Sequence, residues 1–338
     1  MTRDVLVLIG AVGWALAVPH YASDFVVSLV LSCLMYAALA SSWSLFCGAT
    51  RYMSLATSAF FGIGAYAAAL SLERLPWVAA VALGAALAAA VALVMGLAVL
   101  HLRGTYFAVL TFGMTELIRH AVTYWEKQVT GTVGRVLGVV PERDTVYLTV
   151  LALAAGAVGT AIAVRRSRFG LALLGIGADE QRAQTLGVDT RWTKTAGFAI
   201  SAAFAGGVGA AMSVRWTYID PVTVFNPFIG FQTVLIALIG GAATLWGPLI
   251  AALVFSLLAE TLRLQLPQLY MMTLGLLLIV CVLYLPGGLA SLRGATLRGW
   301  LDGWRRWLAD DAPRALRDLQ ALPLALRAAW RRRREASR

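Results

Sequence analysis

The stretch RRSRFGLALLGIGADEQRAQTLGVDTRWTK, residues 165–194, is a polar island in the middle of an otherwise apolar chain. Apolar residues recur in it at near-helical spacing, at Leu171, Leu174, Ala178, Ala183 and Leu186. This spacing predicts one short amphipathic helix, which Gly187 would end as a C-cap. Two interpretations are open at this point: a solvated loop between two membrane spans, or a helix on the cytoplasmic face that another protein grips.

The composition around this island is that of an integral membrane protein. Hydrophobic residues make up 60% of the 338 positions and charged residues only 13%, whereas soluble domains are about a quarter charged. Cys33 and Cys47 lie fourteen residues apart, which is about 21 Å along one helix, too far for a disulfide. The few cysteines and histidines have no metal-ligand spacing, so we expect no metal site.

Runs of about 20 apolar residues predict an all-α, polytopic transmembrane bundle of about eight to ten spans. The expected spans are approximately 5–18, 25–47, 55–72, 77–100, 104–120, 145–164, 195–214, 229–243, 247–263 and 269–286. Residues 1–290 would form this membrane domain, with the 165–194 loop inside it. The distribution of Lys and Arg favours cytoplasmic N- and C-termini.

Residues 291–338 form a basic, Trp-rich tail. From Arg293 onward it holds twelve arginines and five acidic residues, so it supplies most of the net charge of +11. Such a tail is typical of a binder of the inner leaflet rather than of nucleic acid. We expect an amphipathic helix on the lipid bilayer or a partly disordered extension.

Three segments inside the spans are unusual. Small residues recur from residue 51 to 70, which predicts a span buried among other helices; there Ser54 and Ser58 would share one helical face that Thr57 adjoins. Prolines within 216–227 predict a broken or re-entrant piece. Glu116 and Arg119, near the end of the expected span 104–120, favour a helix-end ion pair over a proton relay.

Several motifs of known chemistry are missing from the sequence. It has no G-x-x-x-x-G-K-[ST] loop, no His-Glu-x-x-His, no Gly-x-Ser-x-Gly and no paired carboxylates inside the expected spans. We therefore expect a pathway former, not an enzyme. An ion-coupled secondary transporter would need a buried carboxylate or broken helices in an inverted repeat, and an intramembrane enzyme would need a nucleophile–base or metal set; the sequence indicates neither.

Four stretches resemble the branched-chain amino-acid ABC transporter permease family, and within it the Liv M type. Residues 54–66, SLATSAFFGIGAY, resemble that family's S-L-G-H-A-A-F-F-G-I-G-A-Y. Residues 102–108, LRGTYFA, continue to Glu116 and Arg119 as in L-R-G-x-Y-x-A…E-I-I-R. Residues 167–187 are similar to S-R-F-G-R-A…D-E-x-A-A-x-x-L-G, and 240–248 to G-G-x-G-S-L-W-G-P. The chain departs from the pattern at 56–57, where Ala-Thr replaces Gly-His, at Arg182, which replaces an alanine, and at Leu171, which replaces an arginine.

The resemblance implies a permease subunit of a bacterial inner-membrane importer for leucine, isoleucine and valine; urea, short amides or another small organic substrate remain alternatives. It implies two ABC ATPase subunits that hold ATP and Mg, a second homologous permease and a periplasmic binding protein, with no cofactor in this chain. It places a cytoplasmic coupling helix at the polar island, with ATPase contacts at Asp179, Glu180, Arg182, Ala183, Leu186 and Gly187. Candidates for the pathway and its packing are Ser54, Thr57, Ser58, Gly62, Gly64, Tyr106, Glu116, Gly240 and Gly241.

Overall fold

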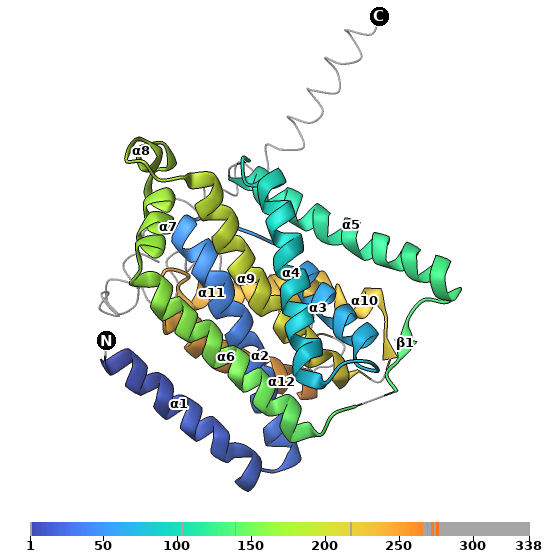
Figure 1. The fold of residues 1–338 in the computed structure, drawn as a ribbon. Coiled ribbons are helices and arrows are strands. Elements are labelled where there is room, and N and C mark those ends of the chain that lie inside the picture. The colour runs from blue at the N-terminus through green and yellow to red at the C-terminus, as the bar shows by residue number, and fades with distance from the viewer. Residues whose placement is uncertain are drawn as a thin grey trace, which may run out of the picture. The chain divides into compact units, whose positions relative to one another are not determined.

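Long apolar runs form long helices in the part of the chain that the structure describes. The computed structural model describes residues 2–265, except 103, 139 and 217, and the positions 269, 272, 273, 275 and 276. Its α-helices are α1 (Thr2–Tyr21), α2 (Asp24–Trp43), α3 (Thr57–Ser71), α4 (Trp77–Val99), α5 (Thr105–Thr130), α6 (Arg143–Arg165), α7 (Arg168–Ala178), α8 (Glu180–Thr185), α9 (Thr190–Met212), α10 (Pro221–Val224), α11 (Pro227–Gly240) and α12 (Gly247–Gln265). This arrangement confirms the expected all-α bundle (Figure 1).

Short irregular elements join some of these helices. A π-helix (Ser44–Gly48) continues α2, and a 3-10 helix (Ser213–Arg215) follows α9. Two strands, β1 (Arg135–Val136) and β2 (Tyr218–Ile219), pair in antiparallel register. We call the end of the bundle that carries α7 and α8 the loop end, and the end that carries β1 and β2 the strand end (Figure 1).

Six helical stretches among the described residues are long and apolar enough to cross a membrane. They are Asp24–Gly48, Trp77–Val99, Arg143–Arg165, Thr190–Arg215, Pro221–Gly240 and Gly247–Gln265. The expected spans that begin at residues 5 and 55 correspond to shorter apolar stretches, Asp4–Pro19 within α1 and Thr57–Ser71, which is α3. The expected span 269–286 lies almost entirely outside the described residues, and the tail 291–338 lies wholly outside them.

The centre of the bundle is formed by close packing of α9 against α3 and α4. A Cβ atom at Gly64 of α3 would lie 1.8 Å from the carbonyl oxygen of Gly206 on α9, and one at Gly209 would lie 2.0 Å from that of Phe61. Only glycine permits backbones to approach this closely. Nearly all of α3 is buried, which confirms the burial that its small residues predict.

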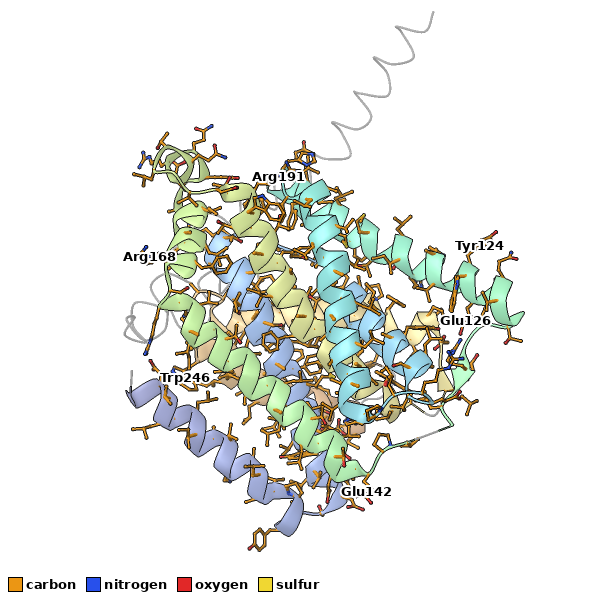
Figure 2. The ribbon with its side chains drawn as sticks, in the orientation of Figure 1. Tyr124, Glu126, Glu142, Arg168, Arg191 and Trp246 are labelled. Carbon is orange, nitrogen blue, oxygen red and sulfur yellow. The ribbon has the colours of Figure 1, made fainter. Side chains whose placement is uncertain are left out.

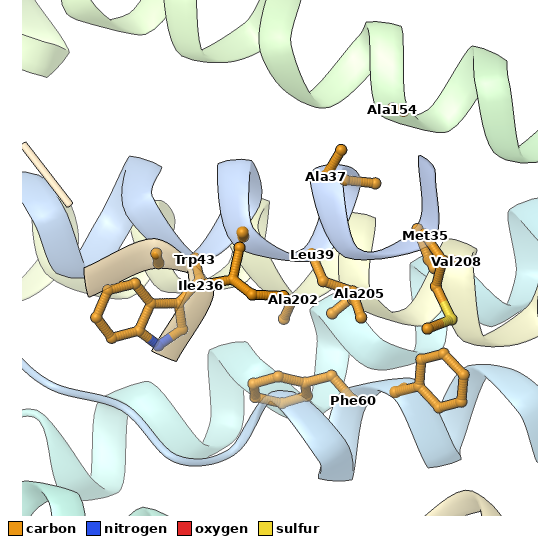
Figure 3. Packing of buried hydrophobic residues seen from close by; sticks show 14 of the residues in the cluster. Met35, Ala37, Leu39, Trp43, Phe60, Ala154, Ala202, Ala205, Val208 and Ile236 are labelled. Carbon is orange, nitrogen blue, oxygen red and sulfur yellow. The ribbon is translucent and has the colours of Figure 1, made fainter. Parts of the chain in front are cut away.

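A hydrophobic core continues from this contact toward α2. Figure 3 shows Met35 and Leu39 of α2, Ala202 and Ala205 of α9 and Phe60 of α3 gathered in one cluster. The facing positions on α9 are small, so the larger side chains of α2 and α3 fill the space between the helices. This core fixes the position of α9, which leads to the polar island at its N-terminus.

The segment from 216 to 227 is broken, as its prolines predict. It contains β2, the four-residue helix α10 and the start of α11 at Pro227. Asp220 caps α10 by accepting a hydrogen bond from the Thr223 backbone N–H at 3.3 Å, and Asn226 caps α11 by accepting one from Phe228 at 2.9 Å. Each cap starts a new helix immediately after the last one ends, so no single helix passes through this segment.

Candidate coupling site and pathway residues

The polar island folds into two helices, α7 and α8, instead of the single helix expected from Leu171 to Leu186. Asp179 is extended, with φ −160° and ψ 109°, and it separates the two helices. Its carboxylate accepts hydrogen bonds from the backbone N–H groups of Gln181 at 3.0 Å and Arg182 at 3.2 Å. An aspartate that caps a following helix satisfies donors that a continuous helix would use internally. The single-helix prediction is therefore wrong, because Asp179 works as an N-cap.

Gly187 ends α8 in the way its position predicts. Its φ is +83°, in the left-handed region. The Gly187 N–H donates to the Gln184 carbonyl at 3.0 Å, and the Val188 N–H donates to the Ala183 carbonyl at 3.1 Å. This pair of bonds is the Schellman arrangement, in which glycine avoids the steric cost that a Cβ atom adds. The chain then turns into α9, which Asp189 caps through the Trp192 N–H at 3.1 Å.

A buried polar cluster fastens α8 to the rest of the bundle. The Lys194 Nζ donates to Glu180 Oε1 at 2.6 Å, to the Leu100 carbonyl at 2.7 Å and to the Tyr52 hydroxyl at 3.2 Å. The Tyr52 hydroxyl in turn donates to Glu180 Oε2 at 2.6 Å. We call these four groups the Lys194 cluster. It joins α8, the start of α9, the end of α4 and the segment before α3.

Because the Lys194 cluster is buried, each of its charged groups needs a partner within the protein. The side chains of Lys194 and Glu180 are 4% and 10% exposed. Removing two charges from water costs several kcal/mol per ion, and only good geometry with further hydrogen bonds offsets that cost. The contacts of Lys194 with a carboxylate, a carbonyl, a hydroxyl and the Tyr52 ring, 4.7 Å from its centroid, provide this compensation. α8 is therefore attached to the bundle through a fixed ion pair.

The expected ATPase contacts divide between a surface and an interior group. Leu186 and Arg182 are 84% and 85% exposed, and Arg182 forms an ion pair with Asp179 at 3.1 Å. In contrast, Ala183 is buried at 4% exposure inside this chain. Glu180 points into the Lys194 cluster. Ala183 and Glu180 therefore hold α8 in place, whereas Arg182 and Leu186 contribute to the outward surface of the loop. Figure 2 labels Arg168 and Arg191 at the same end of the bundle.

The expected helical face of Ser54 and Ser58 is not formed. α3 begins at Thr57, and residues 51–55 before it are not helical, with Arg51 at φ +59°. The Ser54 hydroxyl accepts the Ala56 N–H at 3.2 Å and its carbonyl accepts the Trp43 indole N–H at 2.8 Å. These local bonds compete with helix formation. The prediction that Ser54 and Ser58 share one helical face is therefore wrong, although the Ser54, Thr57 and Ser58 side chains are all buried.

The glycines expected in the pathway all lie at close contacts or turns. A Cβ atom at Gly62 would lie 2.3 Å from the Phe225 ring, and one at Gly240 would lie 2.4 Å from the Gly247 backbone. Gly241, at φ +89°, turns the chain between α11 and α12. It also lines a pocket of about 410 Å³, and among the described residues that line this pocket only Arg51 is charged. Gly62, Gly64 and Gly240 are packing positions, and Gly241 borders open space.

Tyr106 and Glu116 both lie on α5, apart from these glycines. Tyr106 is largely exposed near the start of the helix. Glu116 forms the expected ion pair with Arg119. However, α5 continues to Thr130, ten residues beyond the end expected for this span. The pair therefore lies in the middle of a helix and not at its end, where the sequence interpretation placed it.

One buried acid was missed by the sequence interpretation. Glu126 on α5 is fully buried and accepts hydrogen bonds from the Tyr66 hydroxyl at 3.1 Å and the Gly134 N–H at 2.9 Å. Its other carboxylate oxygen lies 3.5 Å from the Arg135 Nε. Glu126 lies close to β1, at the strand end (Figure 2). It ties α5 to α3 and to the chain around β1, far from the Lys194 cluster.

These features belong to a known kind of membrane protein. Residues 25–283 match the family model described as "Branched-chain amino acid transport system / permease component". The chain belongs to this permease family. It is therefore a multi-pass protein of the inner membrane and a permease subunit of an ABC transport system, a type of system that includes ATPase and binding-protein partners.

Two curated relatives carry names consistent with this family. The chain is 24% identical over 328 residues to the high-affinity branched-chain amino acid transport system permease protein LivM of Escherichia coli (strain K12), covering 87% of this chain and 76% of the relative. It is also 24% identical over 325 residues to the LivM protein of Salmonella typhimurium, covering 86% and 75%. No solved structure matches the chain. The family-level resemblance deduced from the four sequence stretches is thus confirmed.

Proposed function

We propose that this permease forms half of the translocation pathway of an importer for leucine, isoleucine and valine. The permease family and the names of both LivM relatives support this substrate class. The second half of the pathway would be a homologous permease. A periplasmic binding protein would deliver the substrate at the strand end. Two ATPase subunits would hold ATP and Mg at the loop end, so that this end would lie in the cytoplasm. Both chain termini would be cytoplasmic, as the distribution of Lys and Arg favours.

The observation that carries the coupling part of this proposal is the Lys194 cluster. A docking helix transmits force only if it is fixed to the spans that have to move. The buried ion pair between Glu180 and Lys194, 2.6 Å long, attaches α8 directly to α9. The Tyr52 hydroxyl and the Leu100 carbonyl extend this attachment to the segments beside α3 and α4. ATPase closure against α8 would therefore tilt several helices together.

The outward surface of the loop suits an ATPase cleft. Leu186 and Trp192 present exposed apolar side chains beside the charged Arg182 and Arg191. An apolar anchor ringed by charges is the usual form of a helix that binds in a groove. Arg182 is free to exchange its exposed pairing with Asp179 for a carboxylate of the ATPase.

Reconstituted transport tests this function. The permease would be purified with its second permease and ATPases, placed in proteoliposomes, and supplied with the binding protein and radiolabelled leucine. We expect leucine uptake only when ATP is supplied on the side of the membrane that carries the ATPases. Isoleucine and valine should inhibit this uptake. Uptake without ATPases would refute the ABC coupling. Uptake of urea or short amides but not of leucine would refute the substrate class alone.

A further inference from the structure

The pocket beside Gly241 is a cavity between two ends of the helical bundle's elements: the π-helix that continues α2 and the turn that joins α11 to α12. Its volume of about 410 Å³ falls within the usual range for small-molecule sites, roughly 300–1,000 Å³. The described residues that line it are mostly apolar; they are Trp43, Cys47, Gly48, Arg51, Met53, Leu238, Gly241, Ala242, Ala243 and Thr244. We call this space the Arg51 cavity.

The walls of the Arg51 cavity are fixed by contacts within the chain. A Cβ atom at Gly48 would lie 2.0 Å from the Ala242 carbonyl oxygen, so the π-helix lies directly on the turn. The Arg165 Nη2 donates to the Thr244 carbonyl at 2.8 Å, which holds the turn from its other side. π-Helical turns that interrupt long helices are frequent at functional sites. The cavity is therefore a built feature of the fold.

Arg51 is the only charged residue among the described residues that line this cavity. Its side chain is exposed and forms no hydrogen bond or ion pair with the described part of the chain. Its backbone has φ +59°, and it is the only non-glycine residue with positive φ in the described ranges. Such a conformation costs free energy and persists only where the surrounding structure fixes it, often at ligand sites. The fold therefore holds an unpaired guanidinium beside an apolar cavity.

The groups around the cavity match the three parts of an aliphatic amino acid. A guanidinium binds a carboxylate through two parallel hydrogen bonds. Apolar walls at Trp43 and Leu238 suit an aliphatic side chain. The 14-residue helix α11 ends at the cavity, with Leu238 and Gly241 in the lining. The C-terminal end of a helix carries a partial negative charge, which favours an ammonium group.

Arg51 also connects the cavity to the coupling loop. It lines an open cleft of about 330 Å³ together with Asp179 and Glu180, which places the cavity at the loop end. The next residue in the chain, Tyr52, belongs to the Lys194 cluster through its hydroxyl. A ligand that holds the Arg51 side chain would therefore restrain the segment that attaches α8 to the bundle.

We propose that the Arg51 cavity binds the transported amino acid from the cytoplasmic side and that its occupancy slows further import. The carboxylate pairs with Arg51, the aliphatic side chain lies along Trp43 and Leu238, and the ammonium faces the end of α11. A ligand favours the arrangement of the protein that it binds best. The bound amino acid thus stabilises one position of Arg51 and Tyr52 and opposes the movement of α8. This inference rests on the proposed leucine import function.

The test measures the initial uptake of radiolabelled leucine by the complete reconstituted transporter, with and without unlabelled leucine on the ATPase side. The ratio of the two rates removes any change in the basal rate. We expect unlabelled leucine on that side to inhibit uptake by the wild type. In Arg51→Asn the concentration that halves uptake should rise at least about tenfold, because a charge-assisted, two-point contact is lost.

Two features of the variants make this comparison specific. Asparagine tolerates the left-handed backbone conformation, so Arg51→Asn removes the charge without forcing the turn at φ +59° to change. Arg168→Gln is the matched control, since Arg168 is an exposed arginine at the loop end (Figure 2) that lines neither the cavity nor the cleft. It should keep the inhibition of the wild type.

Analogues of leucine test the chemistry of the ligand. Leucinamide lacks the carboxylate and should not inhibit, and isocaproate, which is leucine without its amino group, should inhibit less than leucine. The proposal is overturned if leucine on the ATPase side leaves wild-type uptake unchanged, or if Arg51→Asn is inhibited as strongly as the wild type. Equal inhibition by leucine and either analogue overturns the assignment of an amino acid. A wild-type transporter that imports no leucine with ATP contradicts the proposed function instead.

Discussion

Breaking the Lys194 cluster is expected to destabilise this permease more than any surface change in the coupling loop. Lys194→Met removes the cation but leaves the Glu180 carboxylate, 10% exposed, without its counter-charge. Removing one partner of a buried ion pair costs about 3–5 kcal/mol. Tyr52→Phe removes only the hydroxyl that bridges to Glu180 Oε2 at 2.6 Å. We expect it to cost about 1.5–3 kcal/mol, the range for a hydrogen bond to a charged group.

The double variant Glu180→Gln with Lys194→Met sharpens this expectation. Both charges are gone, so no ion remains buried without a partner, and replacing a complete pair is often close to neutral. The losses of unfolding free energy in the single variants Glu180→Gln and Lys194→Met should therefore sum to more than the loss in the double variant. The difference, which is the interaction energy of the pair, should be about 3 kcal/mol. Arg182→Gln is the matched control, because the Arg182–Asp179 pair is exposed and such pairs contribute about 0–1 kcal/mol.

Two measurements check this prediction. The free energy of unfolding of each purified full-length variant is obtained by denaturant titration in detergent micelles. The ATP hydrolysed for each leucine transported is then measured in proteoliposomes, where Tyr52→Phe should raise this ratio above that of the wild-type transporter. If Lys194→Met costs no more than Arg182→Gln, or if the single losses simply add, α8 is not held by this ion pair and the coupling argument fails.

Three further changes test other parts of the fold. Gly187→Val places a β-branched residue at φ +83°; we expect a loss of about 1–3 kcal/mol in denaturant titration and ATP hydrolysis that no longer responds to loaded binding protein. Gly64→Leu forces a side chain against the α9 backbone 1.8 Å away and should abolish assembly in size-exclusion chromatography, whereas Gly10→Leu, with no atom within 4 Å, should assemble normally. Glu126→Gln weakens the hydrogen bonds that Tyr66 and Gly134 donate to a buried carboxylate and should lower the free energy of unfolding by about 1.5–3 kcal/mol, measured by the same titration; a loss below about 0.5 kcal/mol would show that these bonds do not stabilise the strand end.

The sequence predicts the helices well because the membrane constrains them strongly. Long apolar runs have few alternatives to helix, so the expected spans from residue 5 to 263 coincide with described helices. The turn at Gly187 and the broken segment at 216–227 were also predictable, since glycine and proline act through local backbone geometry. These signals need no knowledge of distant contacts.

Other features depend on contacts that hydropathy does not record. The periodic apolar positions on both sides of Asp179 favour one continuous helix, although an aspartate at that place is also a good N-cap. The polar run after Arg119 resembles a loop, yet it stays helical because Glu126 is enclosed by Tyr66 and the chain around β1. Lys194 and Tyr52 are 142 residues apart, and nothing in the sequence pattern pairs them.

The Lys194 cluster at the loop end and the Glu126 contacts at the strand end are linked through the packed helices α9 and α3. Helix α9, with 23 residues, is about 34 Å long. Near its N-terminus Lys194 is fixed to α8, and near its C-terminus Gly209 touches the backbone of Phe61 on α3. α3 in turn carries Tyr66, which bonds Glu126 at the strand end. Because close-packed backbones leave no room for local adjustment, a displacement of α8 has to move α9 and α3 together or break one of these contacts.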